Sequence, residues 1–418
     1  MRVLLVTDSY WPLIGGATRS TRQLARHLTA RGHVVAVVTA WQSGVPERDD
    51  DGGVAVFRIR DLTSRTTRLS ADPHRHTPPP WPDPEATVRI SCVVRRFQPD
   101  LVHSYGWLSY SCALALTRRR VPLLLSVRDY GNICPLRTLV CHERCGGRPG
   151  LWACLPDSTR FYGRVKGTLA VVGVRSGRRL LRATMHGEHA VSTYVADLAC
   201  THLSGGLDLP RAVIPDFHER YGGGEADAAI LAQLPAVPFV MFVGALRRIK
   251  GVQELLDSYE SLSDAPPLVL IGTRAPDSPE RYPPGVTVLY DVPNATVMEA
   301  WRRAMFGVAP STLPEPLGNV IHEAMSAGRA VIGTRPGGHS DIIEHGHNGL
   351  LVPSGDVSAL RDAMRRLIDD HDLRAHMGAR ARVTADRFTP APALERFESL
   401  YGATIRAAKT GTVRRRGR

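Results

Sequence analysis

Residues 1–39 read MRVLLVTDSYWPLIGGATRSTRQLARHLTARGHVVAVVT, and this stretch decides the fold class. Residues 3–7 form a continuous apolar run, which is typical of a parallel strand that is covered on both faces. Residues 18–31 carry apolar side chains at helical spacing and stop at Gly32. Residues 34–39 form a second apolar run. This strand–helix–strand order indicates a βαβ unit, so we expect an α/β protein with a parallel sheet.

The alternation of strands and helices continues in two separate halves. In the first half it is interrupted by residues 61–87, which are rich in Pro, Arg, Asp and Thr and are typical of a mobile loop or insertion. Residues 128–160 form a second irregular stretch. The glycines at 222–224 indicate a linker, and a new alternation begins at residues 239–243. The pattern therefore predicts two Rossmann-like, doubly wound domains.

We place the N-terminal domain at residues 1–213 and the C-terminal domain at residues 214–392. A last helix at residues 393–408 is expected to pack back on the N-terminal domain. Open α/β sheets bind ligands at the carboxyl ends of their strands. Two such domains facing a central cleft, each with one ligand, would suit a transfer reaction.

Composition excludes some functions and leaves others open. The chain has 418 residues and a formal net charge of +13, which suits phosphate-bearing ligands, an anionic membrane surface or nucleic acid. We rank nucleic acid low, because the sequence has no interleaved aromatic residues and no docking-helix motif. No apolar stretch approaches the roughly 18–20 residues of a membrane span, and the N-terminal apolar run is too short for a signal peptide. We therefore expect a cytoplasmic protein.

Residues 315–328 read EPLGNVIHEAMSAG and form the most informative motif. Prolines break the chain just before this motif, and a helical pattern begins at Val320, so Gly318 and Asn319 lie at a helix N-terminus. Free N–H groups there can bind phosphate or polarised hydroxyls. Glu315 and Glu323 could face one cleft, where a carboxylate suits a vicinal diol such as ribose. On spacing alone, two ordinary surface acids near a helix start are an equally good interpretation.

A second motif, residues 244–251, reads GALRRIKG and lies between a predicted strand and a predicted helix. Arg247, Arg248 and Lys250 place three cations within four positions, where they could bind a diphosphate. Lys250 stands out because the chain has only three lysines. The alternative is a solvated basic loop.

Together these motifs resemble the retaining glycosyltransferases of family 4 (glycosyl transferases group 1), which have the GT-B fold. The Glu-x7-Glu motif of that family matches Glu315 and Glu323, and its Gly-Arg-Leu-x-x-x-Lys-Gly loop matches residues 244–251. Further matches lie at Tyr10–Ala17, Gly337-Gly338 and His347–Pro353. The matches extend over nearly the whole length of the chain, and they occur in the order and at the spacing of the family. The resemblance is therefore specific.

The resemblance implies an N-terminal acceptor domain and a C-terminal domain for a nucleotide-sugar donor. Glu323 would hold the ribose hydroxyls, Glu315 would contact the donor sugar, and Lys250 would hold the diphosphate. Arg247 and Arg248 would complete the catalytic set by reaching the same phosphates. The remaining donor-binding positions that it implies are Leu317, Gly318, Asn319, Val320, Gly244, Gly15 and Gly16.

Two positions depart from the family pattern. Ala245 stands where an arginine is usual, and Arg128-Asp129 stands where the family often has His-Asp. His103 occupies another common His-bearing strand end. We assign Arg128, Asp129 and His103 to the acceptor and sugar side, and the departures at Ala245 and Arg128 bear on which sugar is transferred.

The implied activity is that of a hexosyltransferase-type enzyme of carbohydrate biosynthesis. It would move a sugar from a nucleoside-diphosphate sugar to an acceptor hydroxyl, on a glycan, a lipid-linked molecule or a small molecule. No carboxylate is obviously placed as a nucleophile, so we expect front-face transfer with retained configuration. The family needs no divalent metal, and no cofactor is expected for catalysis. The alternative is a non-catalytic sugar-nucleotide or glycan-binding protein of the same fold.

Four cysteines lie within 21 residues, with spacings of six, three and eight residues between them. They are Cys134, Cys141, Cys145 and Cys154. Four thiolates could hold a structural zinc ion, although the spacing is not that of a standard zinc finger. A loop with reduced thiols is the competing interpretation.

Residues 161–183 predict a helix that is rich in arginine. Its apolar stripe consists of Leu169, Val172, Leu180 and Leu181. Such a helix could rest on the inner face of an anionic membrane, as a peripheral contact. A solvated face over the N-terminal sheet is the other interpretation.

Overall fold

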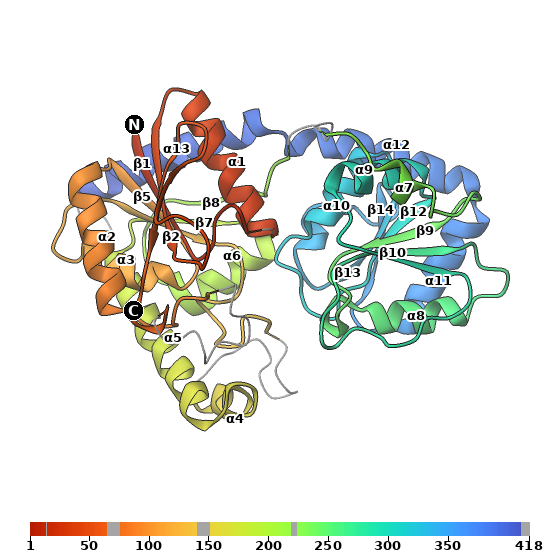
Figure 1. The fold of residues 1–418 in the computed structure, drawn as a ribbon, viewed down its shortest axis with the longest axis horizontal. Helices are drawn as coiled ribbons and strands as arrows, with labels where there is room; N and C mark the ends of the chain where they lie inside the picture. The colour runs from red at the N-terminus through yellow and green to blue at the C-terminus, as the bar shows by residue number, and fades with distance from the viewer. Residues whose placement is uncertain (14, 65–75, 140–150, 219–223, 411–418) are drawn as a thin grey trace. The chain divides into compact units, whose positions relative to one another are not determined.

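The computed structural model describes residues 1–418 except 14, 65–75, 140–150, 219–223 and 411–418. The chain divides into two compact units, which Figure 1 shows with their strands in the middle and helices around them. Unit 1 comprises Met1–Pro215 and Ala391–Arg418, and unit 2 comprises Asp216–Pro390. Each unit is built on its own sheet, as the two predicted βα alternations require.

Unit 1 contains an eight-stranded sheet in the order β3-β4-β2-β1-β5-β6-β7-β8. Its strand pairings are parallel except for the antiparallel pair of β3 and β4. The central strands are buried along most of their length, as their continuous apolar runs predict. The strands are β1 (Arg2–Thr7), β2 (Val34–Ala40), β3 (Arg48–Asp50), β4 (Ala55–Ile59), β5 (Leu101–Tyr105), β6 (Leu123–Val127), β7 (Gly187–Ala190) and β8 (Arg211–Val213).

The helices of unit 1 connect and cover these strands. They are α1 (Gly16–Ala30), α2 (Pro84–Phe97), α3 (Leu108–Leu116), α4 (Leu151–Tyr162), α5 (Arg164–Thr184), α6 (Thr193–Ala199), which continues into a π-helical turn at Cys200–Ser204, and α13 (Pro390–Thr410). Helix α13 returns from the end of the chain to unit 1. There the ring Nε2 of His33 lies 2.9 Å from Glu398 Oε1. The backbone of Gly187 lies so close to Thr404 that a Cβ atom would sit 2.3 Å from its hydroxyl oxygen.

Unit 2 contains a six-stranded parallel sheet in the order β11-β10-β9-β12-β13-β14. Its strands are β9 (Val240–Val243), β10 (Leu268–Gly272), β11 (Val286–Tyr290), β12 (Phe306–Ala309), β13 (Val331–Arg335) and β14 (Gly349–Pro353). Figure 1 shows α9 and α10 on one side of this sheet and α8 and α11 on the other. The helices are α7 (Ala228–Leu231), α8 (Val252–Glu260), α9 (Asn294–Arg303), α10 (Asn319–Ser326), α11 (Val357–Asp369) and α12 (His371–Ala385). Short 3-10 turns lie at Arg248–Lys250, Gly338–Asp341 and Asp386–Phe388.

Strands β9 and β12 are neighbours in the sheet of unit 2 and run in the same direction. Their carboxyl ends therefore meet at the same edge. The loop that follows β9 carries residues 244–251, and the loop that follows β12 carries residues 310–318. The topology thus brings the two strongest sequence motifs to one place.

Several helices differ from the sequence prediction: α2 begins at Pro84, inside the predicted loop, and α4, α6, α7 and α12 are not predicted. The irregular stretch predicted at 128–160 contains most of α4, whose interior includes Pro156. Proline cannot donate the helical hydrogen bond at that position, so residue preferences argue against a helix there. Helix α12 is not predicted, because its buried face carries only one large apolar side chain. Its buried residues are Met377, Gly378, Ala381 and Thr384.

Candidate active site

The loop between β9 and α8 carries Lys250 and is packed tightly against the loop after β12. Gly251 caps α8 with φ of 72°, and a Cβ atom at this position would lie 1.9 Å from the carbonyl oxygen of Pro310. Only glycine allows this approach and this backbone conformation. The N–H of Thr312 also donates to the carbonyl oxygen of Ile249 over 3.2 Å. Lys250 is thereby fixed beside the segment that contains Glu315.

Lys250 and Glu315 form an ion pair, with 2.6 Å between Nζ and Oε1. The hydroxyl of Ser311 donates to the same carboxylate oxygen over 2.5 Å. Burial raises the pKa of the Glu315 carboxyl, but the charge of Lys250 and these hydrogen bonds lower it more, so its pKa lies below the ordinary value. The second carboxylate oxygen is not involved in either of these two hydrogen bonds.

Removing the carboxylate should change the pH dependence of stability. A lowered pKa means that Glu315 stabilises the folded protein above its ordinary pKa of 4.5, and that this contribution is lost as pH falls through the folded pKa. At pH 7 we expect Glu315→Gln to lower Tm by about 3 °C, and we expect this difference to shrink below about pH 4.5. Thermal unfolding between pH 3 and 7 checks this. Glu260→Gln, on the exposed end of α8, is the matched control, and a pH-independent difference for Glu315→Gln would contradict the assignment.

Helix α10 begins at Asn319 after Gly318, which has φ of 93°. A Cβ atom on Gly318 would lie 2.6 Å from the ring of His339, so the backbone at this helix N-terminus is left open by a glycine. The side-chain amide of Asn319 donates to Asp216 over 3.3 Å. The helix N-terminus therefore combines free N–H groups with a rigid position, as a site for phosphate or hydroxyl groups requires.

Glu323 lies one turn further along α10 and is buried. The side-chain amide of Asn294, at the start of α9, donates to Glu323 Oε1 over 3.3 Å. Leu317 is buried and Val320 is half-buried at the same end of the helix. The structure thus places the predicted donor-binding positions of the motif around one helix start in unit 2.

His339 belongs to this site and was not singled out by the sequence. Its Nδ1 accepts the N–H of Thr334 over 3.0 Å, so a neutral ring carries its proton on Nε2. Burial lowers the pKa of His339 to about 4, which keeps the imidazole neutral near pH 7. The glycine pair Gly337-Gly338, directly before His339, was the sequence feature that could have indicated this part of the site. A Cβ atom on Gly338 would lie 2.2 Å from the carbonyl oxygen of Pro316, so the pair marks a close approach of two loops.

The two arginines of the Lys250 loop have different surroundings. Arg247 Nε pairs with Asp277 over 3.1 Å at the surface. The backbone N–H of Arg248 donates to the same carboxylate over 3.3 Å. Within the part of the chain that the structure describes, the guanidinium of Arg248 has no ion-pair partner. Their predicted contacts with phosphate therefore stay predictions.

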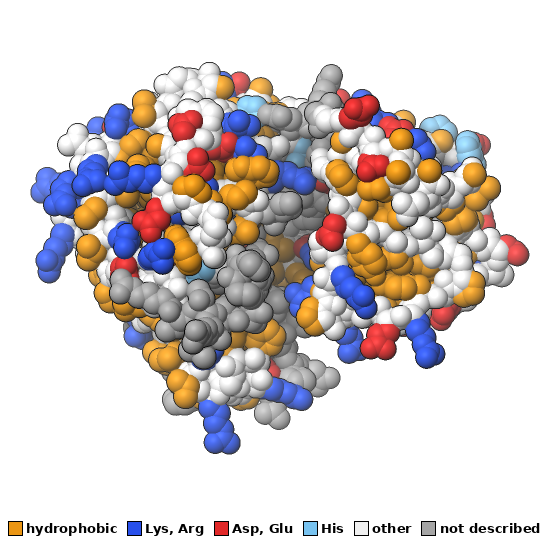
Figure 2. All heavy atoms as spheres, viewed as in Figure 1, with side chains coloured by type: hydrophobic (Ala, Val, Ile, Leu, Met, Phe, Trp, Pro, Cys, Tyr) orange, Lys and Arg blue, Asp and Glu red, His pale blue; other side chains and the backbone are white. Residues whose placement is uncertain are grey.

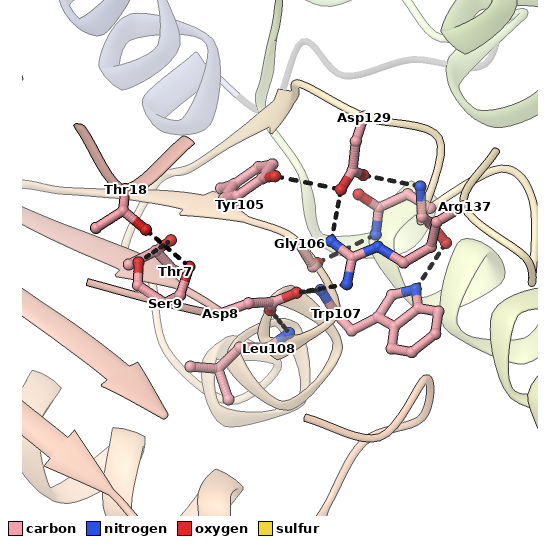
Figure 3. A network of polar contacts seen from close by, with 12 residues as sticks. Thr7, Asp8, Ser9, Thr18, Tyr105, Gly106, Trp107, Leu108, Asp129 and Arg137 are labelled. Carbon is pink, nitrogen blue, oxygen red and sulfur yellow. Dashed lines mark hydrogen bonds and ion pairs between the residues drawn. The ribbon is translucent and has the colours of Figure 1, made fainter. Parts of the chain in front are cut away.

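At the carboxyl ends of β1, β5 and β6, unit 1 holds a second polar network (Figure 3). Arg137 lies between two carboxylates, 3.3 Å from Asp8 Oδ2 and 2.5 Å from Asp129 Oδ2. Tyr105 also donates its hydroxyl to Asp129 over 3.2 Å. Burial lowers the pKa of the Arg137 guanidinium, but the two carboxylates raise it more, so its pKa lies above the ordinary value. The sequence missed Asp8 and Arg137, because neither belongs to a family motif or a regular pattern.

Asp8 also fixes the start of α3. Its carboxylate accepts the N–H groups of Trp107 over 3.1 Å and Leu108 over 2.8 Å. Gly106 has φ of 77°, and a Cβ atom there would lie 2.4 Å from the Asp8 carboxylate. Burial is the main cause that raises the pKa of Asp8. Side-chain contacts, rather than backbone pairing, therefore connect the ends of β1, β5 and β6 to the loop that carries Arg137.

The other predicted residues of unit 1 are distributed around this network. Arg128 donates to the hydroxyl of Thr21 over 3.3 Å, on α1. Gly15 and Gly16 lie at the start of that helix. His103 is instead buried against α13, where its Nδ1 lies 3.0 Å from the hydroxyl of Tyr401. These contacts explain the position of His103 by its packing against α13. Its predicted role on the acceptor side stays a prediction.

Comparison with known proteins agrees with this arrangement. Residues 14–173 match the family described as Glycosyltransferase Family 4, and residues 237–370 match the family described as Glycosyl transferases group 1. The D-inositol 3-phosphate glycosyltransferase of Pseudarthrobacter chlorophenolicus is 31% identical over 392 residues, covering 89% of this chain and 86% of that protein. The chain belongs to the family 4 glycosyltransferases. A shorter match, 35% identical over 100 residues, covers 24% of this chain and 26% of N-acetyl-alpha-D-glucosaminyl L-malate synthase from Bacillus anthracis.

Solved structures of similar proteins confirm the GT-B fold of this glycosyltransferase. Sucrose-phosphate synthase from Thermosynechococcus elongatus superposes with a TM-score of 0.74 at 18% identity, covering 97% of this chain and 100% of that one. HepE from Anabaena, in complex with UDP-glucose, superposes with a TM-score of 0.68 at 17% identity, covering 96% and 99%. The predicted fold class is therefore confirmed, and the family matches confirm the predicted enzyme class.

Two further predictions for this glycosyltransferase remain open. Cys141 and Cys145 lie outside the described residues, while Cys134 and Cys154 are buried. Among the residues that are described, no group of three or more histidine, cysteine or acidic side chains could hold a metal ion. The zinc site therefore stays a prediction. Within the same part of the chain, every helix is too short or too polar to cross a bilayer.

Proposed function

We propose that this glycosyltransferase transfers a sugar from a nucleoside-diphosphate sugar to an acceptor hydroxyl and retains the anomeric configuration. The observation that carries the proposal is the contact between Lys250 and Glu315 beside the N-terminus of α10. It joins a cation for the diphosphate, a carboxylate for the sugar and open N–H groups within unit 2. The solved structure of HepE with UDP-glucose supports this type of donor by analogy of fold.

In the proposed complex, Glu323 binds the ribose hydroxyls and Glu315 binds a hydroxyl of the donor sugar. Lys250 moves its hydrogen bond from Glu315 to the diphosphate, or shares it between the two. The leaving nucleoside diphosphate gains negative charge as the glycosidic bond breaks. Lys250 and the N–H groups at the start of α10 are already in place to stabilise that charge, so little reorganisation is needed in the transition state.

We propose that no protein carboxylate attacks the sugar. Glu315 is paired with Lys250, while Asp8 and Asp129 share Arg137, so these carboxylates are already committed to cations. The acceptor hydroxyl then attacks from the face that the diphosphate leaves, and a phosphate oxygen accepts the hydroxyl proton. Neutralisation by Lys250 replaces the divalent metal that other transferases use, so the proposed reaction needs no metal.

A donor panel tests the proposal. We expect slow hydrolysis, or saturable binding, of one donor among UDP-, GDP-, ADP- and TDP-sugars, with the same rate in excess EDTA. The transferred product should keep the anomeric configuration of the donor, which NMR measures on the glycoside because a free sugar mutarotates during slow hydrolysis. No hydrolysis and no binding with any donor would contradict a nucleotide-sugar donor, and an inverted product would contradict front-face transfer.

Donor binding by a Glu323 variant tests whether the donor binds at this site. Glu323→Gln removes one charged hydrogen-bond acceptor for the ribose diol and should weaken donor binding about tenfold, with a smaller effect on turnover. Glu299→Gln changes the same group on the surface of α9, where Glu299 pairs with Arg302, and serves as the control. Equal binding by both variants would exclude Glu323 from the donor site.

A further inference from the structure

Helix α5 and the end of α4 expose an unusual row of large apolar side chains. Phe161 is 70% exposed, Val165 is 73%, Leu169 is 48% and Val172 is 49%. The predicted stripe on this helix was therefore wrong in part, because Leu181 is fully buried. Exposed apolar residues that lie in a row, rather than singly, mark a surface that binds something.

The opposite face of α5 already makes the contacts with unit 1. Its buried residues are Gly167, Ala170, Val171, Gly173, Val174, Gly177 and Leu181. A Cβ atom on Gly177 would lie 2.5 Å from the ring of Tyr110, and one on Gly173 would lie 2.5 Å from the carbonyl oxygen of Pro80. At about 100° per residue, Val165, Leu169 and Val172 lie about half a turn away from this packed face. The apolar row is therefore not needed to hold the helix in place.

The charged side chains from Ser158 to the end of α5 are all basic. Between Ser158 and Gly187 the sequence has seven cations and no acidic residue. Arg178 and Arg182 are turned toward unit 1, where they donate to the carbonyl oxygens of His202 and Leu203. Arg164, Arg175 and Arg179 are exposed, and none of the described residues forms an ion pair with them. Figure 2 shows hydrophobic and basic side chains side by side at the lower end of unit 1, where Figure 1 labels α4.

We infer that this face of α4 and α5 is a docking surface for an anionic lipid bilayer. Val165, Leu169, Val172 and Phe161 would enter the boundary between headgroups and acyl chains, and the arginines beside them would contact lipid phosphates. A lipid bilayer is the occupant because the row combines exposed apolar side chains with exposed arginines, and α5 itself has no acidic residue; the acid nearest to the row in the sequence, Asp157 on α4, is half-buried. The helix lies on the bilayer and does not cross it, in keeping with the absence of a membrane-spanning helix among the described residues.

The experiment is vesicle flotation with the full chain. The vesicles are made of phosphatidylcholine alone, or of phosphatidylcholine with phosphatidylglycerol as the anionic lipid. We expect the protein to float with the anionic vesicles, to stay in solution with the neutral ones, and to bind less at high salt. A Val165→Glu, Leu169→Glu, Val172→Glu variant should bind at least about tenfold less, because it adds three charges of the wrong sign.

Two comparisons separate the surface from general effects of charge and folding. Val383→Glu changes an exposed valine on α12, 64% exposed, in unit 2, and should leave vesicle binding unchanged. Arg175→Gln, Arg179→Gln should weaken binding to anionic vesicles and reduce its salt dependence. Each variant is checked for an unchanged melting curve before flotation.

Three outcomes would overturn the inference. The wild-type protein does not bind anionic vesicles, the triple variant binds as well as the wild type, or the triple variant instead converts a dimer to a monomer in solution. The last outcome would make a second copy of the chain the occupant of this face. None of these readouts depends on glycosyl transfer, so the docking surface and the proposed reaction can fail separately.

Discussion

Lys250→Ala should lower turnover about tenfold to a thousandfold, the range for removing one group that stabilises developing charge in a transition state. The ammonium is in place before the reaction, held 2.6 Å from Glu315. An alanine leaves the departing diphosphate with only the N–H groups of α10 and whichever arginine can reach it. The effect should therefore appear in kcat more than in KM for the donor.

The matched control is Lys409→Ala, the same substitution at an exposed position in the last turn of α13. It should leave both kinetic constants unchanged. Lys250→Arg should recover part of the loss, since it restores the charge but not the compact geometry of an ammonium. If Lys250→Ala keeps nearly normal turnover with saturating donor, Lys250 is not an electrostatic catalyst and the donor site must be sought elsewhere.

The sequence could predict the proximity of Lys250 and Glu315 for a simple topological reason. Each follows a strand with a continuous apolar pattern, and parallel strands place their carboxyl ends at one edge of the sheet. Because β9 and β12 are neighbours, the loops touch even though the residues are 65 positions apart. Glycine at 251 and the helix start at Asn319 then fix the details.

Arg137 shows why the rest of the site could not be predicted. It lies in the irregular stretch after β6, has φ of 62°, and belongs to neither a helix nor a strand. One of its carboxylate partners, Asp8, is 129 residues away in the sequence. Without periodicity or a motif, the sequence shows only one more arginine among many. The network depends on tertiary contacts that no local pattern encodes.

Helix α5 marks a different limit. Its periodicity predicts a helix correctly, but apolarity alone selects the wrong face for the core. The buried face is built largely from glycine, alanine and valine because it approaches Tyr110 and Pro80 closely. Larger apolar residues such as Leu169 are then left on the surface. Close packing, rather than side-chain hydrophobicity, decides which face is buried.

Arg137→Ala should destabilise unit 1 by about 3 kcal/mol, which corresponds to a Tm lower by about 10 °C. Removing the guanidinium leaves Asp8 and Asp129 close together without their shared cation. We use the lower end of the range for a broken buried ion pair, because 26% of the Arg137 side chain remains exposed. Thermal unfolding followed by tryptophan fluorescence measures the effect, since Trp107 lies 5.0 Å from the guanidinium.

Arg89→Ala is the matched control, because Arg89 pairs with Glu85 on the surface of α2. Such an exposed pair is worth at most about 0.5 kcal/mol, so the control should melt close to the wild type. Adding Asp129→Asn to Arg137→Ala should recover part of the lost stability, because it removes one of the two uncompensated carboxylates. If the double variant melts no higher than Arg137→Ala alone, charge is not the cause of the loss. Lost packing of Arg137 against Trp107 would then account for the destabilisation.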